Sequence, residues 1–91
     1  MKYMLAWKIA PGHIKSAAEA FLKTSGQMPT GLSQVGRWHA PGSATGWVVV
    51  EGDPSAVAQH VAEWEHLLEF QITPVLEDAD AAKALATVYG K

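Results

Sequence analysis

The stretch GRWHAPGSATGWVVVE, residues 36–51, indicates two β-strands joined by a tight turn. Pro41 and Gly42 take the second and third positions of a four-residue turn, where these residue types are favoured. The flanking runs, residues 32–40 and 44–51, are rich in the β-branched and aromatic residues that favour strands. This hairpin decides the fold, because it fixes two adjacent strands in the middle of the sequence. The order of the helices and strands before and after it can then be worked out.

A strand and a helix precede the hairpin. Residues 3–9 are β-prone and end at the chain-breaking pair Pro11-Gly12. Residues 13–23 then carry apolar side chains at helical spacing, with lysine and glutamate on the opposite side. A loop rich in turn residues, SGQMPTG, leads from this predicted helix into the hairpin.

A helix, a strand and a second helix are predicted after the hairpin. Asp53 is a good N-cap residue and Pro54 suits the first helical position, so a helix begins there. Residues 68–76 predict a fourth strand, in which Pro74 indicates an edge position or a bulge. Residues 78–89 carry a last apolar stripe at helical spacing, with acidic residues at the start.

The resulting order, β-α-β-β-α-β with a terminal helix, is typical of the ferredoxin-like α+β fold. In that arrangement a four-stranded antiparallel sheet has both long helices on the same face. A chain of 91 residues has room for one core. We therefore expect a single domain over residues 1–91.

Composition excludes several classes of function. The net charge is −2 and the seven lysines and arginines are scattered, which argues against nucleic-acid binding. The absence of cysteine excludes disulfides, thiol nucleophiles and thiolate metal sites. The N-terminal apolar run is short and is interrupted by Lys8, so we expect neither a signal peptide nor a membrane span. These features predict a cytoplasmic protein.

The predicted strands are apolar on both of their faces. A sheet with one hydrated face alternates apolar and polar residues, but YMLAW at 3–7 and WVVV at 47–50 do not. Charged residues make up 18% of the chain, against about 25% in a usual soluble domain. Because two helices cover only one face of the sheet, we expect the other face to pack against a second copy in a homodimer.

Three segments carry a resemblance to a known family: Trp7 in the first strand, residues 36–51, and EWEHLLEFQITPV at 63–75. With these segments, nearly the whole chain resembles the dimeric α/β-barrel superfamily and, more narrowly, the DUF3303 family of unknown function. The superfamily includes cofactor-free monooxygenases, polyketide cyclases, muconolactone isomerases and heme-degrading enzymes. Their pocket lies between the sheet and its own helices. The resemblance therefore implies a location for a site, but no particular chemistry.

The four tryptophans are the candidate ligand-binding residues. Trp7, Trp47 and Trp64 could wall a pocket for a flat organic molecule, and Trp38 shares the hairpin surface of Trp47. The alternative is that a small domain uses such large side chains to fill its core. Trp64 in particular falls in the apolar stripe of its predicted helix.

The turn also predicts which side chains of the hairpin share a face. Pairing centred on the Pro-Gly pair places Trp47 opposite Gly36, so that the indole ring covers the glycine. Trp38 and Gln34 then lie on the same face as Trp47.

Four polar side chains are the candidate catalytic groups: Arg37, His39, Glu51 and His66. Arg37 and His39 share the face opposite the hairpin tryptophans, where they could bind a carboxylate and move a proton. The alternative for this pair is protection of an edge strand or polar pairing at a dimer seam. Glu51 would serve as a general base if buried, and is simply hydrated if it lies at the strand end. His66 lies close to the pocket mouth that the resemblance implies.

His60, Glu63 and His66 follow one another at a spacing of three residues on a predicted helix. Such a series could bind a metal ion, but the sequence supplies no second cluster to complete the coordination. We expect a solvated ion-pair face and no metal. The heme enzymes of the superfamily use an axial histidine, which neither His60 nor His66 is placed to supply, so we expect no cofactor.

The sequence thus predicts a homodimer that binds a small apolar or aromatic metabolite between its sheet and helices. Any chemistry there would be cofactor-free, with the four polar candidates available to hold or move a proton. The alternative is a non-catalytic assembly protein, in which the tryptophans fill the core and leave no open pocket.

Overall fold

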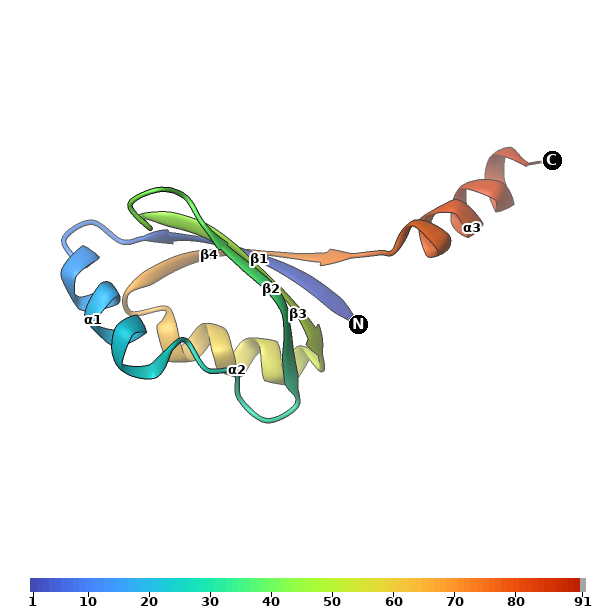
Figure 1. The fold of residues 1–91 in the computed structure, drawn as a ribbon. Coiled ribbons are helices and arrows are strands. Elements are labelled where there is room, and N and C mark those ends of the chain that lie inside the picture. Colours follow the sequence, from blue (N-terminus) through green and yellow to red (C-terminus); the bar gives the residue numbers. More distant parts are fainter. Residues whose placement is uncertain (91) are drawn as a thin grey trace.

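The computed structural model of the chain describes residues 1–90, which form seven elements in the predicted order (Figure 1). Most boundaries lie within one residue of those expected from the sequence. The elements are β1 (Lys2–Ile9), α1 (Ile14–Thr24), β2 (Leu32–His39), β3 (Thr45–Gly52), α2 (Pro54–Trp64), β4 (Leu68–Val75) and α3 (Asp78–Tyr89).

Within the described chain the strands form one four-stranded sheet in the order β2-β3-β1-β4. Every neighbouring pair is antiparallel. Helices α1 and α2 lie on the same side of this sheet (Figure 1). The fold is therefore the predicted ferredoxin-like α+β arrangement with a C-terminal helix, and Pro74 lies on an edge strand, β4, as its missing N–H group requires.

The hydrophobic core lies between α2 and the central strands. Leu5 of β1 and Val50 of β3 are fully buried, and Val57 of α2 packs against them. Burying each such side chain stabilises the fold by about 1.5–3 kcal/mol. Tyr3, Leu32 and Ala56 belong to the same cluster and lie toward the end of the sheet where β1 begins and β3 ends. The other end of the sheet, around Trp7, therefore has fewer buried side chains packed against it.

The β2–β3 hairpin pairs in a register two residues away from the predicted one. Trp38 lies opposite Trp47, not Thr45. The reason is a longer loop, which is closed by the Ala40 N–H group donating to the carbonyl oxygen of Thr45. A shift of two residues preserves the alternation of faces. Trp38 and Trp47 therefore share one face as predicted, and Arg37 is on the other.

A β-bulge at Val35 interrupts the pairing of β2 with β3. Gln34 pairs with Val50, and the next residue paired is Gly36, opposite Val49. The extra residue reverses the alternation on the N-terminal side of the bulge. The prediction that Gln34 shares the tryptophan face is therefore wrong, because Gln34 lies on the helix-covered side.

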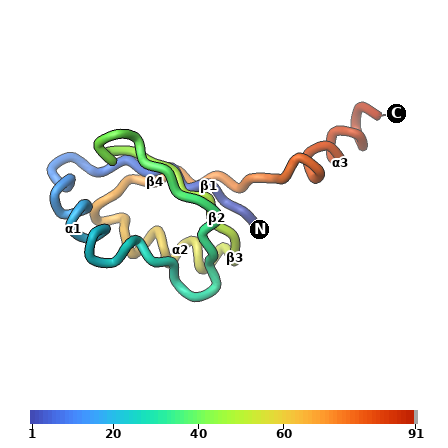
Figure 2. The backbone as a smooth tube through the Cα atoms, in the orientation of Figure 1, coloured from blue at the N-terminus to red at the C-terminus, as the bar shows by residue number. Residues whose placement is uncertain are grey.

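Helix α3 extends away from the sheet beyond the end of β4 (Figures 1 and 2). The segment before the helix is anchored by an ion pair between the ammonium group of Lys2 and the carboxylate of Glu77. Every residue of α3, all of which are described, retains solvent exposure, including the apolar Leu85 and Val88. Among residues 1–90, no helix is both long and apolar enough to cross a membrane.

Candidate functional site

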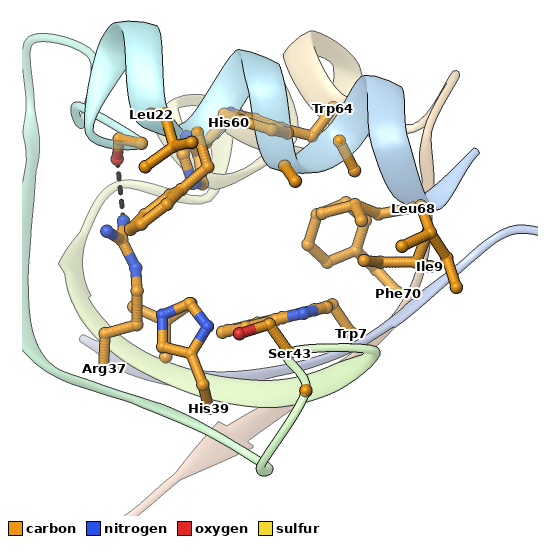
Figure 3. Close-up of a pocket in the computed structure, with 17 residues that line it drawn as sticks. Trp7, Ile9, Leu22, Arg37, His39, Ser43, His60, Trp64, Leu68 and Phe70 are labelled. Carbon is orange, nitrogen blue, oxygen red and sulfur yellow. Dashed lines mark hydrogen bonds between the residues drawn. The ribbon is translucent and has the colours of Figure 1, made fainter.

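A cavity of about 310 Å³ lies between the sheet and helices α1 and α2 (Figure 3). Small-molecule sites usually enclose about 300–1,000 Å³. All four strands, both helices and the β2–β3 turn contribute to its walls, and most of the side chains are apolar. The lining residues are Trp7, Ile9, Ile14, Ala17, Ala18, Phe21, Leu22, Gly26, Arg37, His39, Gly42, Ser43, Val48, His60, Trp64, Leu68 and Phe70.

Trp7 forms part of the sheet side of the cavity (Figure 3). It pairs with Gly46 of β3 on one side and with Phe70 of β4 on the other. A Cβ atom at position 46 would collide with the indole ring and with the backbone oxygen of Trp38. The indole can therefore lie across β3 only because residue 46 has no side chain.

His39 stands at the rim of the cavity, where it remains exposed to solvent. Its imidazole meets the ring of Trp7 edge-on, at 5.1 Å between centroids and 75° between planes. It meets Phe21 of α1 in the same way, at 5.3 Å and 63°. Edge-to-face contacts of this kind orient a ring. His39 is thus held between the sheet and α1 at the entrance.

Arg37 ties the end of α1 to β2. Its Nη1 donates to the carbonyl oxygen of Ser25 at 3.0 Å, and its Nη2 donates to that of Gly26 at 2.7 Å. A helix leaves its last carbonyls without partners and carries negative charge at that end, so a cation there is favourable. Burial lowers the pKa of Arg37 from its ordinary value, although an arginine remains charged in proteins. The guanidinium of Arg37 therefore acts as a clamp, meaning that its hydrogen bonds hold the C-terminal end of α1 against β2.

His60 is a buried polar side chain of the cavity wall, with 4% of its surface exposed. Within residues 1–90 its Nδ1 has no hydrogen-bond partner, although Oε1 of Glu63 lies 3.4 Å away, within ion-pair distance. Burial lowers the pKa of His60 from about 6.5, with the Glu63 carboxylate opposing the shift and Arg37 adding to it. The imidazole is therefore neutral at pH 7.

Four of the candidate ligand-binding and catalytic residues meet at this cavity: Trp7, Trp64, Arg37 and His39. They come from β1, α2 and β2. The structure thus brings together two of the aromatic candidates and two of the polar candidates.

Trp38 and Trp47 do not line the cavity. Trp7 pairs with Gly46, so Trp47, one residue further along β3, points to the uncovered face of the sheet. Trp38 pairs with Trp47 and lies on the same face. The prediction of one pocket walled by Trp7, Trp47 and Trp64 is therefore wrong for Trp47, because strand alternation places Trp7 and Trp47 on opposite sides.

Glu51 and His66 also lie outside the cavity. Glu51 is at the end of β3 on the uncovered face, with 54% of its side chain exposed and its Oε2 3.9 Å from the ammonium nitrogen of Lys2. His66 follows the end of α2 and lines a separate hollow with Gln27 and Met28. Neither residue lines the cavity between the sheet and the helices.

The sequence did contain a signal for His60 that the solvated-face interpretation missed. His60 lies three residues after the buried Val57, and a residue at that offset shares the core-facing side of a helix. The expected ion-pair face is therefore wrong for His60, which faces inward. In residues 1–90, no group of three or more histidine, aspartate or glutamate side chains is arranged to hold a metal ion.

The family model DUF3303, a domain of unknown function, matches residues 1–89, a range that includes all seven elements. No curated protein and no solved structure matches the chain. A match over almost the full length establishes the family, and the chain therefore belongs to DUF3303.

Proposed function

We propose that this chain is a homodimeric protein that binds a small, largely apolar or aromatic molecule in the cavity between its sheet and helices α1 and α2. The cavity itself carries the proposal. Its walls are mostly apolar side chains, and removing apolar surface from water is favourable by about 25 cal/mol per Å². A small apolar molecule that enters the cavity buries its own surface together with that of the walls.

Chemistry at this site is cofactor-free and uses the imidazole groups at the cavity. His60 is neutral and inside, and His39 is at the rim beside Trp7. A neutral imidazole can accept a proton from a bound molecule and return it. Arg37, whose Nη1 and Nη2 donate to backbone carbonyls, keeps α1 in place as one wall of the cavity.

The uncovered face of the sheet supports a homodimer. Trp38 is 58% exposed and Trp47, directly opposite it, is 41% exposed. Met4 and Val49 pair with each other on the same face. Monomeric proteins rarely expose a contiguous apolar surface of this kind. A second copy that presents the same face would cover both surfaces around a two-fold axis.

The tryptophans provide a direct test of cavity binding. In a ¹⁵N–¹H correlation spectrum, titration with naphthalene is expected to shift the indole N–H signals of Trp7 and Trp64, which line the cavity. The indole signals of Trp38 and Trp47, on the other face, should stay in place and serve as internal controls. No shift at Trp7 or Trp64 with naphthalene or other flat apolar compounds would contradict the proposal.

The alternative function, non-catalytic assembly, is favoured by one observation. Helix α3 presents Leu85 and Val88 to solvent, and neither residue lines the cavity between the sheet and helices α1 and α2. A protein that serves only assembly would form a stable oligomer while all four indole signals stayed unchanged during the same titration. The two functions are therefore separated by one set of spectra.

A further inference from the structure

The environment of His60 indicates what kind of molecule the cavity takes. Its ring lines the cavity, yet its Nδ1 is buried and has no hydrogen bond within residues 1–90. An unpaired buried polar atom is costly, so a group that persists in this state needs a reason. The neighbouring Oε1 of Glu63, 3.4 Å away on the same helix, supplies one.

The carboxylate of Glu63 selects the tautomer of His60. An ionised carboxylate only accepts hydrogen bonds, so a proton on Nδ1 of His60 is attracted to it, and a lone pair on Nδ1 is repelled. In neutral imidazole the proton occupies one nitrogen and the other is an acceptor. With the proton on Nδ1, the nitrogen on the opposite edge of the ring, Nε2, is the acceptor that remains for a bound molecule.

The other polar groups at the cavity are less available. The guanidinium of Arg37 donates to the carbonyl oxygens of Ser25 and Gly26. His39 stands at the exposed rim, between the ring edges of Trp7 and Phe21. Ser43 of the β2–β3 turn also lines the cavity but is exposed to solvent. A molecule inside the cavity therefore meets largely apolar walls and the buried, neutral imidazole of His60.

We propose that the cavity selects a flat, apolar ring compound with a neutral hydroxyl group, whose O–H donates to Nε2 of His60. Glu63 is a positioning residue that holds the proton of the neutral imidazole on Nδ1, so that Nε2 is the acceptor. A carboxylate in place of the hydroxyl is disfavoured, because it has no proton to donate and would lose its hydration in an apolar site. This inference rests on the proposed function and names the ligand class for the same cavity.

Three probes of the same shape test the inference: naphthalene, 2-naphthol and 2-naphthoate. Dissociation constants are measured from the indole signals of Trp7 and Trp64 at pH 7. One hydrogen bond to a preformed acceptor is expected to make 2-naphthol bind about tenfold more tightly than naphthalene, with 2-naphthoate the weakest. In His60→Phe this preference should vanish while naphthalene still binds, whereas His66→Phe, at a histidine that does not line the cavity, should retain the preference.

The outcomes separate the two proposals. If none of the probes binds, the proposed function fails. If all three bind equally, or if 2-naphthoate binds most tightly, the cavity binds ligands but His60 does not select a hydroxyl, and the present inference is overturned. If His60→Phe does not fold, comparison of the three probes on the natural chain still decides between these results.

A separate measurement tests the role of Glu63. Long-range ¹H–¹⁵N spectra of the imidazole distinguish a proton on Nδ1 from one on Nε2, and the natural chain is expected to show it on Nδ1 of His60. Glu63→Ala should lose this preference, and Glu63→Gln should retain it because an amide oxygen also accepts. A proton on Nε2 in the natural chain would overturn the assignment without any substitution.

Discussion

Gly46 and Gly36 each lie beneath a tryptophan ring, and they provide a matched pair of substitutions on opposite faces of the sheet. In Gly46→Ala the new methyl group meets the Trp7 ring and the backbone oxygen of Trp38, which cannot move freely. We expect a loss of about 2 kcal/mol in the free energy of unfolding, and weaker binding of naphthalene because Trp7 is displaced. Urea denaturation and the indole titration measure the two effects.

Gly36→Ala is the control. The atoms nearest to its methyl group belong to the ring of Trp38, whose exposed side chain can turn away. We expect a change within about 0.5 kcal/mol in the free energy of unfolding and unchanged binding of naphthalene. Equal losses of binding in the two variants would show that Trp7 does not shape the cavity.

At the scale of residues, the sequence predicted relations within an element but not those between distant elements. Arg37 and His39 share a face because strand alternation is local. The separation of Trp7 from Trp47 depends on how β1 meets β3, two strands that are distant in the sequence and have no connecting turn to fix their register. The interpretation of Trp47 as a pocket residue failed for that reason.

At the scale of elements, α1 depends on Arg37 for its attachment to the sheet. Arg37→Met keeps the length of the side chain but removes both hydrogen bonds to Ser25 and Gly26. Hydrogen bonds to charged groups contribute about 1.5–3 kcal/mol each net of their exchange with water, and because the bond to Ser25 is exposed we expect a loss of about 2 kcal/mol. Amide hydrogen exchange should accelerate along α1, because its C-terminal end is released from β2.

Lys23→Met is the matched control, since it removes an exposed cation from the last turn of the same helix. Its exchange rates along α1 should stay close to those of the natural chain. Arg37→Lys should restore only part of the loss, because an ammonium group cannot span two carbonyls as the guanidinium fork does. Unchanged exchange in Arg37→Met would exclude the proposed clamp.

The residues at which helices and strands begin and end were predictable, because strong local signals in the sequence mark them. Asp53 and Pro54 start α2, and a Pro-Gly pair follows β1. The bulge at Val35 was not predictable, since nothing in its residue type requires an extra residue in the strand. The cavity was not predictable from the sequence either. The apolar face of α1 indicates which side of the helix turns toward the sheet, but not how far the helix lies from the sheet.

At the scale of the whole molecule, the single chain is more extended than a compact domain of its length. Its radius of gyration is 15.6 Å, whereas a compact chain of this size has about 12 Å. Helix α3 causes the difference, because it stands away from the sheet with no buried residue among its described positions (Figure 2). Together with the tryptophan-bearing face, α3 gives the chain two apolar surfaces that a second copy can cover.

Light scattering coupled to size-exclusion chromatography is expected to show a dimer at micromolar concentration. Trp47→Glu places a charge in the proposed interface twice, once in each subunit. At about 2 kcal/mol for each central aromatic residue, dimerisation should weaken about 1,000-fold and a monomer should appear. Leu22→Glu is the control, because it makes the same kind of change at an exposed position on α1, away from that face.

The pattern of oligomeric states also locates the interface. A dimer that survives Trp47→Glu but dissociates in Leu85→Glu would assign the contact to α3 and reject pairing through the sheet. A natural chain that remains monomeric at micromolar concentration would reject both. Because the cavity lies on the opposite side of the sheet from Trp47, naphthalene binding by a monomeric Trp47→Glu variant would show that the site is complete within one chain.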